Sequence, residues 1–118
     1  MATQTYEIVD ARTNTLVARM VEEATGRWRS FRGLMLTKHL PSERGLLIRP
    51  ARGIHTHFMR FPIDLIFLDE RNRVVKIRSS MPPWRIAPAR AAAVIEVAAG
   101  LADAAGVRIG DEFLFRSV

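Results

Sequence analysis

Cysteine is absent from the 118 residues of the sequence, and so is any long run of uncharged residues. Without cysteine the chain forms no disulfide, offers no thiolate nucleophile and holds no cysteine-ligated zinc or iron–sulfur centre. The longest stretch between charged residues is the seven residues from Gly53 to Met59, whereas a transmembrane helix needs about 20 apolar residues. The N-terminal residues also lack the basic and apolar regions of a secretory signal. We therefore expect no membrane span and a cytoplasmic location.

Lysine is scarce as well, since the chain has 16 arginines but only 2 lysines, and with 12 carboxylates its formal net charge is +6. An excess of positive charge is typical of proteins that bind polyanions. The arginines fall into separate local groups, however, and the 15 alanines point to the codon usage of a GC-rich genome. RNA-recognition motifs, phosphate-binding loops and serine-hydrolase elbows are missing. A nucleic-acid-associated protein that works through its arginine-rich surface is thus an alternative supported by charge alone.

The N-terminal part of the sequence predicts a β-hairpin followed by a helix. Two β-prone runs, Thr5–Val9 and Thr15–Val21, are separated by polar residues that suit a turn. Over residues 25–35, aromatic and methionine side chains recur at helical spacing behind a threonine that can cap the first turn. We expect this helix to bury that apolar face in the core.

The central part of the sequence predicts a second hairpin. The run Ile63–Leu68 is apolar at every position except Asp64, which is typical of a strand that is buried on both faces. Residues 69–72 are turn formers, and Asn72 is the one that best tolerates positive φ. The alternation in Val74–Arg78 then predicts a half-buried returning strand.

The other predicted elements are short. In chain order they are a strand at Leu46–Arg49, a loop at Ser79–Pro88 that three prolines favour, a strand at Ala92–Val97, a helical turn at Leu101–Ala105 that Gly106 closes, and a last strand whose Phe113 and Phe115 point inward. About seven strands and one or two short helices, with no βαβ rhythm and no linker, predict a single α+β domain over residues 1–118. We expect its sheet to be mainly antiparallel and curled toward a small barrel.

Several segments together resemble the uncharacterised family called domain of unknown function 192. They are RGLM at 32–35, IHTHFMRFPIDLIFLD at 54–69, VVKI at 74–77, VIEVAAG at 94–100 and GVRIGD at 106–111. The resemblance covers most of the chain and implies a compact β-rich fold with a short helix, without an established activity. Two features depart from the family. Many members look secreted or membrane-attached, which this N-terminus does not support, and a segment that often reads Gly-Met-Leu-Phe is Gly-Leu-Leu-Ile at 45–48.

Polar side chains gather in the otherwise apolar central region, and they make the leading candidate for a binding site. A carboxylate in an apolar strand is costly unless it is paired, so Asp64 needs an arginine, backbone amides or a ligand as its partner. We predict a non-catalytic domain that binds a small, anionic ligand, with Arg32 able to make a bidentate contact. The predicted ligand-binding residues are Arg32, His55, Thr56, Arg60 and Asp64.

An alternative is a metal-dependent hydrolase or oxygenase. His55 and His57 would project from one face of a strand, and with Asp64 they could hold a divalent zinc or iron. Their spacing matches no strong metal signature, so we expect no resident cofactor and favour a non-enzymatic role. Glu96, between Ile95 and Val97, raises the same question as Asp64. If the two acids met on adjacent strands, they would make an acid–base pair.

Overall fold

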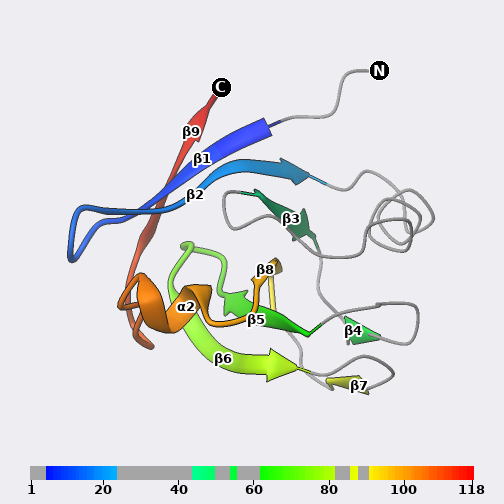
Figure 1. The fold of residues 1–118 in the computed structure, drawn as a ribbon. Helices are drawn as coiled ribbons and strands as arrows, with labels where there is room; N and C mark the ends of the chain where they lie inside the picture. Colours follow the sequence, from blue (N-terminus) through cyan, green and yellow to red (C-terminus); the bar gives the residue numbers. More distant parts are fainter. Residues whose placement is uncertain (1–4, 24–43, 50–53, 56–61, 82–85, 88–90) are drawn as a thin grey trace.

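A computed structural model describes residues 5–23, 44–49, 54–55, 62–81, 86–87 and 91–118 (Figure 1). These residues form nine strands and one short helix. They are β1 (Thr5–Asp10), β2 (Thr15–Glu23), β3 (Arg44–Ile48), β4 (Ile54–His55), β5 (Ile63–Leu68), β6 (Val74–Met81), β7 (Ile86–Ala87), β8 (Ala93–Ala98), β9 (Phe113–Ser117) and helix α2 (Leu101–Ala104). Within these ranges, no helix is long and apolar enough to cross a membrane.

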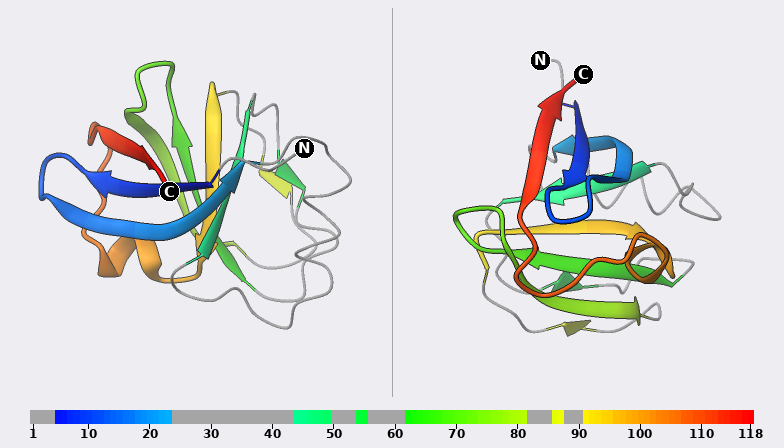
Figure 2. Two further views of the ribbon diagram at one scale, coloured as in Figure 1. Left: turned by 90° about the horizontal axis from the view of Figure 1, so that it is seen from above. Right: turned by 90° about the vertical axis from the view of Figure 1, so that its left-hand side faces the viewer.

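Seven strands form one curled sheet in the order β6-β5-β8-β3-β2-β1-β9, and β4 pairs with β7 in a separate two-stranded sheet. The pairing is antiparallel throughout, except that β2 and β3 run parallel. Figure 2 shows the two ends of the sheet curling over one another, so that β1, β2 and β9 run across β5, β6 and β8. The predicted fold, a mainly antiparallel, barrel-like curled sheet with a short helix, is confirmed.

The two edges of the sheet meet at one end. Arg73, just before β6, forms an isolated bridge with Glu112, just before β9. Beside it, the Val74 amide donates to the Asp111 carbonyl at 2.8 Å, and the Gly110 amide donates to the Val74 carbonyl at 2.7 Å. The barrel is therefore closed at this end by backbone hydrogen bonds.

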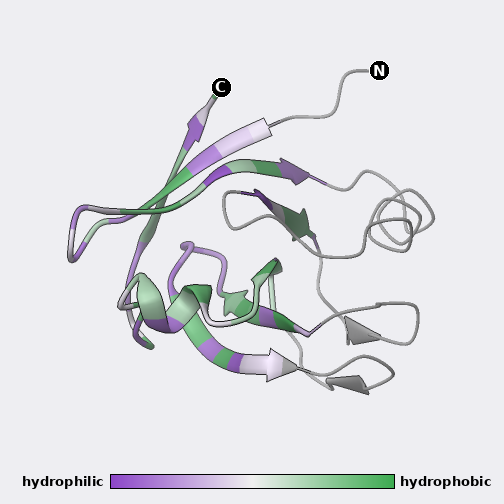
Figure 3. Ribbon diagram, in the orientation of Figure 1, coloured by the Kyte–Doolittle hydropathy of each residue, from purple (hydrophilic) through white to green (hydrophobic). Residues whose placement is uncertain are grey.

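The hydrophobic core fills the inside of the curl. It includes Ile8 from β1, Val21 from β2, Ile66 from β5, Ile95 from β8 and Phe113 from β9, each at most 1% exposed. In Figure 3 the turn between β5 and β6 is hydrophilic, whereas β2 is hydrophobic just before its hydrophilic end. This distribution follows from burial of apolar side chains, the main favourable contribution to folding.

Both predicted hairpins form, and their turns have the expected chemistry. Asn72 in the β5–β6 turn has φ 61° and Asn14 in the β1–β2 turn has φ 54°, a conformation that asparagine tolerates better than most residues. Gly106, with φ 70°, follows α2 as predicted. Phe113 is buried and Phe115 packs against the core from a partly exposed position.

The prediction of a loop over Ser79–Pro88 is wrong in part. Strand β6 continues to Met81, which pairs with Ile63, and Ile86–Ala87 forms β7 against β4. The three prolines of this stretch lie outside the described residues. The two-residue strands β4 and β7 also explain why nine strands are found where about seven were predicted. The helix predicted over 25–35 lies outside the described residues.

Gly45 lies where three strands come closest. It pairs with Val21 of β2 on one side and with Val97 of β8 on the other. A Cβ at this position would lie 3.0 Å from the Glu96 carbonyl oxygen, 3.1 Å from Val97 Cγ1 and 3.3 Å from Val21 Cγ2. The absence of a side chain therefore allows β3 to lie between its neighbours.

We expect Gly45→Ala to lower the free energy of unfolding by about 1–3 kcal/mol, because the added methyl overpacks a tight site whose nearest neighbour is backbone. Urea unfolding of both proteins measures this. Ser79→Ala, at an exposed position of β6, is the control and should change little. Equal stability of Gly45→Ala and the wild type would contradict this account of the packing.

Candidate functional site

Asp64 is fully buried, and its hydrogen-bond partners among the described residues are backbone amides. Its Oδ1 accepts the Ser80 N–H at 2.7 Å, and its Oδ2 accepts the N–H groups of Gly100 and Ala102 at 3.1 and 3.0 Å. Of the partners that the sequence allowed, backbone amides are present, whereas Arg32 and Arg60 lie outside the described residues. The carboxylate joins β5 to the end of β6 and to the first turn of α2, whose amides have no partner within the helix.

Glu96 is also buried, with 2% of its surface exposed, but its situation is different. Its Oε2 has no hydrogen-bond partner among the described residues. Burial raises the pKa of Glu96 to about 8, because the charged form loses its hydration. The Glu96 carboxyl is therefore mostly neutral at neutral pH.

The two buried acids lie on adjacent strands but on opposite faces of the sheet. Asp64 is directly opposite Val97, and Leu65 is directly opposite Glu96. Directly opposed residues project to the same face, and successive residues project to opposite faces. Asp64 thus points toward the core with Ile66, whereas Glu96 points the other way. The acid–base pair considered from the sequence does not form.

We call the side of the sheet that carries Glu96 the Glu96 face. Two rows of directly opposed residues cross it from β6 to β3. The rows are Arg78, Leu65, Glu96 and Leu46, and next to them Lys76, Phe67, Val94 and Ile48. Leu65, Phe67 and Val94 are fully buried, and Arg78 is exposed. The Lys76 ammonium lies 5.9 Å from the centre of the Phe67 ring. The face thus carries one neutral acid in apolar surroundings and two basic residues along its β6 edge.

The other predicted site residues are mostly outside the described part of the chain, which holds neither Arg32, Thr56, His57 nor Arg60. His55 lies in β4, paired with Ile86 of β7. Within the described ranges, no three histidine, cysteine or acidic side chains come together as a metal site would require. The ligand-binding and metal-binding sets therefore stay predictions.

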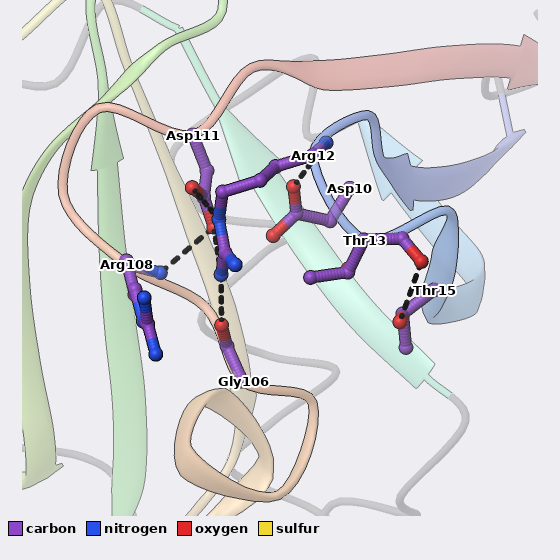
Figure 4. Close-up of polar contacts among 7 residues, drawn as sticks. All are labelled: Asp10, Arg12, Thr13, Thr15, Gly106, Arg108 and Asp111. Carbon is purple, nitrogen blue, oxygen red and sulfur yellow. Dashed lines mark hydrogen bonds and ion pairs between the residues drawn. The ribbon is translucent and has the colours of Figure 1, made fainter.

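Sequence reasoning missed a polar cluster at the closed end of the barrel, shown in Figure 4. Asp111 accepts hydrogen bonds from Arg12 Nε at 2.6 Å and from the Arg108 N–H at 2.9 Å, and Arg12 also donates to the Gly106 carbonyl at 2.7 Å. The Arg12 guanidinium lowers the pKa of Asp111 to about 2. Asp10 is buried beside them. Arg12 and Asp111 are 99 positions apart, and nothing in the sequence around either residue indicates that they meet.

Comparison with known proteins places the chain in a family. The model of DUF192, described as "Uncharacterized ACR", matches residues 8–115. The chain belongs to this family. A UPF0127 protein of Thermococcus sibiricus is 38% identical over 95 residues, which are 72% of this chain and 58% of that protein. A UPF0127 protein of Pyrococcus horikoshii is 43% identical over 62 residues, which are 51% of this chain and 53% of that protein. The DUF192 chain thus spans little more than half the length of these curated relatives.

Two crystal structures share the fold of this DUF192 chain. One, from Sinorhizobium meliloti 1021 and provisionally described as a transcription regulator, has a TM-score of 0.80 at 21% identity and covers 97% of this chain and 94% of its own. The other, a protein of unknown function from Novosphingobium aromaticivorans, has a TM-score of 0.75 at 24% identity and covers 93% of this chain and 83% of its own. At these identities the similarity establishes the fold alone.

We expect Asp64→Ala to lower the free energy of unfolding by about 3 kcal/mol or more, because each backbone N–H left unpaired in the interior costs roughly 1–3 kcal/mol. Chemical denaturation measures the loss. Glu70→Ala removes the same charge from an exposed position in the β5–β6 turn and should be nearly neutral. An Asp64→Ala protein as stable as Glu70→Ala would show that the three amides find other partners.

We expect Glu96→Gln to remove a pH dependence of stability. The raised pKa means that the folded protein holds a proton that the unfolded chain has released, so Glu96 lowers stability as the pH rises from about 4.5 to about 8. The slope is about 1 kcal/mol per pH unit. Urea unfolding at several pH values should therefore give a steeper decline for the wild type than for Glu96→Gln, and Glu70→Gln should behave as the wild type. Parallel pH profiles of wild type and Glu96→Gln would refute this.

Proposed function

We propose that this DUF192 chain is a non-catalytic domain that binds a small anionic ligand on the Glu96 face. The observation that carries the proposal is the buried, neutral Glu96 carboxyl whose Oε2 has no partner among the described residues. Buried polar groups are nearly always hydrogen-bonded, so an orphan of this kind requires an explanation such as a ligand. Strongly shifted pKa values also occur preferentially at functional sites.

The chemistry of the face supports an anion rather than a cation as the ligand. A neutral carboxyl can donate a hydrogen bond to an anionic oxygen, whereas an ionised one would repel it. Arg78 stands in the same cross-strand row as Glu96, two strands away, and Lys76 stands in the next row. Neighbouring strands are about 4.8 Å apart, so an anion of about 10 Å would reach from the edge of β6 to β8.

The residues predicted from the sequence enter the proposal in two ways. Thr56 and Arg60 precede β5 in the sequence, and Ile63 and Leu65 of β5 project to the Glu96 face. We expect Thr56 and Arg60, with Arg32 and His55, to supply further donors to the ligand. Asp64 lies on the opposite face, so its role in this proposal is to hold β5 in place.

The two alternatives have less support. A metal at Asp64 would have to displace N–H groups that now bind both oxygens of its carboxylate. A nucleic-acid partner is supported by the net charge of +6 and by the provisional description of the Sinorhizobium protein. Neither alternative accounts for the neutral Glu96 carboxyl, and for that reason we favour the small anion.

The test is a thermal-shift screen of phosphate, sulfate, carboxylates and nucleotides at pH 6.5, followed by calorimetric titration of each anion that stabilises the protein. A ligand at 100 times its Kd stabilises the folded state by about 2.7 kcal/mol. We expect affinity to fall about tenfold between pH 7 and pH 9 as Glu96 ionises. Glu96→Gln should bind with little pH dependence.

Arg78→Gln should weaken binding, and Arg71→Gln, an equal charge change in the exposed β5–β6 turn, is its matched control. Absence of any stabilising anion, or an affinity that neither Glu96→Gln nor Arg78→Gln alters, would overturn the proposal. Stabilisation by divalent metals alone would favour the metal-dependent alternative, and binding to duplex DNA that weakens steeply with salt would favour the nucleic-acid alternative.

A further inference from the structure

Asp10 is a second buried acid with an unsatisfied oxygen, at the closed end of the barrel. Its side chain is 0% exposed. Its Oδ1 accepts the Arg12 N–H at 3.0 Å, and its Oδ2 has no N–H or hydroxyl partner among the residues that the structure describes. The Arg12 side chain donates to Asp111, which is 4% exposed, so the two carboxyl groups lie beside the same arginine (Figure 4). Two carboxyl oxygens share a hydrogen bond only when a proton lies between them.

Within the described part of the chain, Asp10 forms no ion pair with a cation of its own. The Arg12 guanidinium is committed to Asp111 and to the Gly106 carbonyl. Arg108 contributes its backbone N–H to Asp111. Directly opposite Asp10 are Thr15 on β2 and Phe113 on β9, both uncharged, and the neighbouring Glu112 is exposed. Two carboxyl groups therefore compete for one guanidinium.

The pair sits where the two edges of the sheet join. Three backbone hydrogen bonds join the edges: Val74 N–H to Asp111 O at 2.8 Å, Gly110 N–H to Val74 O at 2.7 Å and Phe113 N–H to Asn72 O at 2.8 Å. Next to them, the Ala11 N–H donates to Glu112 O at 2.9 Å between β1 and β9, which are neighbours in the sheet. Asp10 is the residue before Ala11, and the Asp111 carbonyl accepts the hydrogen bond from Val74. A change in charge at the pair thus acts directly on the closure of the barrel.

We propose that Asp10 and Asp111 form a proton-held latch, in which Asp10 donates a proton from Oδ2 to the Asp111 carboxylate and its release to solvent loosens the joint. Protonated, the pair carries one negative charge, which Arg12 balances. Deprotonated, it carries two adjacent negative charges in a buried site, and the repulsion between them pushes the β1–β2 turn away from the loop before β9.

The direction of the pH dependence follows from the two pKa shifts. Burial and the hydrogen bond to Asp111 raise the pKa of Asp10, so the folded protein keeps this proton where the unfolded chain has lost it. Stability from the latch is complete below the ordinary pKa of aspartate and is lost as the pH rises through the raised value. Asp111, whose pKa is about 2, stays ionised across that window and can accept the hydrogen bond throughout.

The latch is tested by NMR, through the carboxyl ¹³C titration of Asp10 and the amide exchange of Ala11, Val74 and Gly110. Using the Glu96→Gln protein removes from the pH profile the other buried acid whose pKa is raised. We expect Asp10 to titrate above the ordinary aspartate range. As it does, the exchange protection of the three amides should fall, by about tenfold for each pH unit by which the pKa is raised.

Asp10→Asn keeps a donor at the position of Oδ2 and cannot ionise, so its joint should stay protected at every pH. Glu70→Gln, a charge change in the exposed β5–β6 turn, should leave the profile unchanged. The latch is refuted if Asp10 titrates at or below the ordinary value. It is equally refuted if Asp10→Asn loses protection with pH as its parent does. The carboxyl titration decides the matter even where Asp10→Asn folds poorly.

Discussion

The carboxylate of Asp64 connects β5 to β6, to the loop after β8 and to α2. Apolar contacts alone would not fix how these segments are positioned relative to one another. Hydrogen bonds to a charged group contribute about 1.5–3 kcal/mol each, and here three backbone amides from β6, the loop after β8 and α2 converge on one side chain. They fix the face of β5 that turns toward the core. Because successive strand residues alternate, they also fix the face that Leu65 shares with Glu96. The geometry of the Glu96 face thus depends on an anchor on its far side.

Asp64 and Glu96 stand in similar apolar sequences, and the different outcome has a structural cause. Asp64 lies near the start of β5, beside irregular backbone: Ser80 has φ 49° and Gly100 has φ 88°. Such backbone has amides that no strand ladder uses. Glu96 lies in the middle of β8, paired on both sides by β3 and β5, where the ladders consume the neighbouring N–H groups. An acid at the end of a strand finds backbone donors, and an acid in the middle of a sheet does not.

The sequence predicts the parts of this fold that local chemistry decides. Hairpins β1–β2 and β5–β6 follow from alternation and from asparagines that accept positive φ. The burial of Asp64 and Glu96 is also predictable, because each acid interrupts an apolar run. The parallel pairing of β2 with β3 and the closure of β6 on β9 join distant segments, so no local pattern predicts them. The contact between the loops of Asp10 and Asp111 also joins distant segments. In addition, each acid has polar residues beside it in the sequence, so neither stands out as a buried acid.

The positive net charge of the molecule and the local burial of Glu96 and Asp10 shift the pKa values of these acids in opposite directions. A formal charge of +6 favours the ionised form of every carboxyl group. The raised pKa values of Glu96 and Asp10 therefore arise from local burial, against the overall field. Their settings still differ: Asp10 has the carboxylate of Asp111 as an acceptor for its proton, whereas Glu96 has no such neighbour among the described residues. We therefore propose different roles for the two protons: the one at Asp10 serves a contact within the fold, and the one at Glu96 serves a bound ligand.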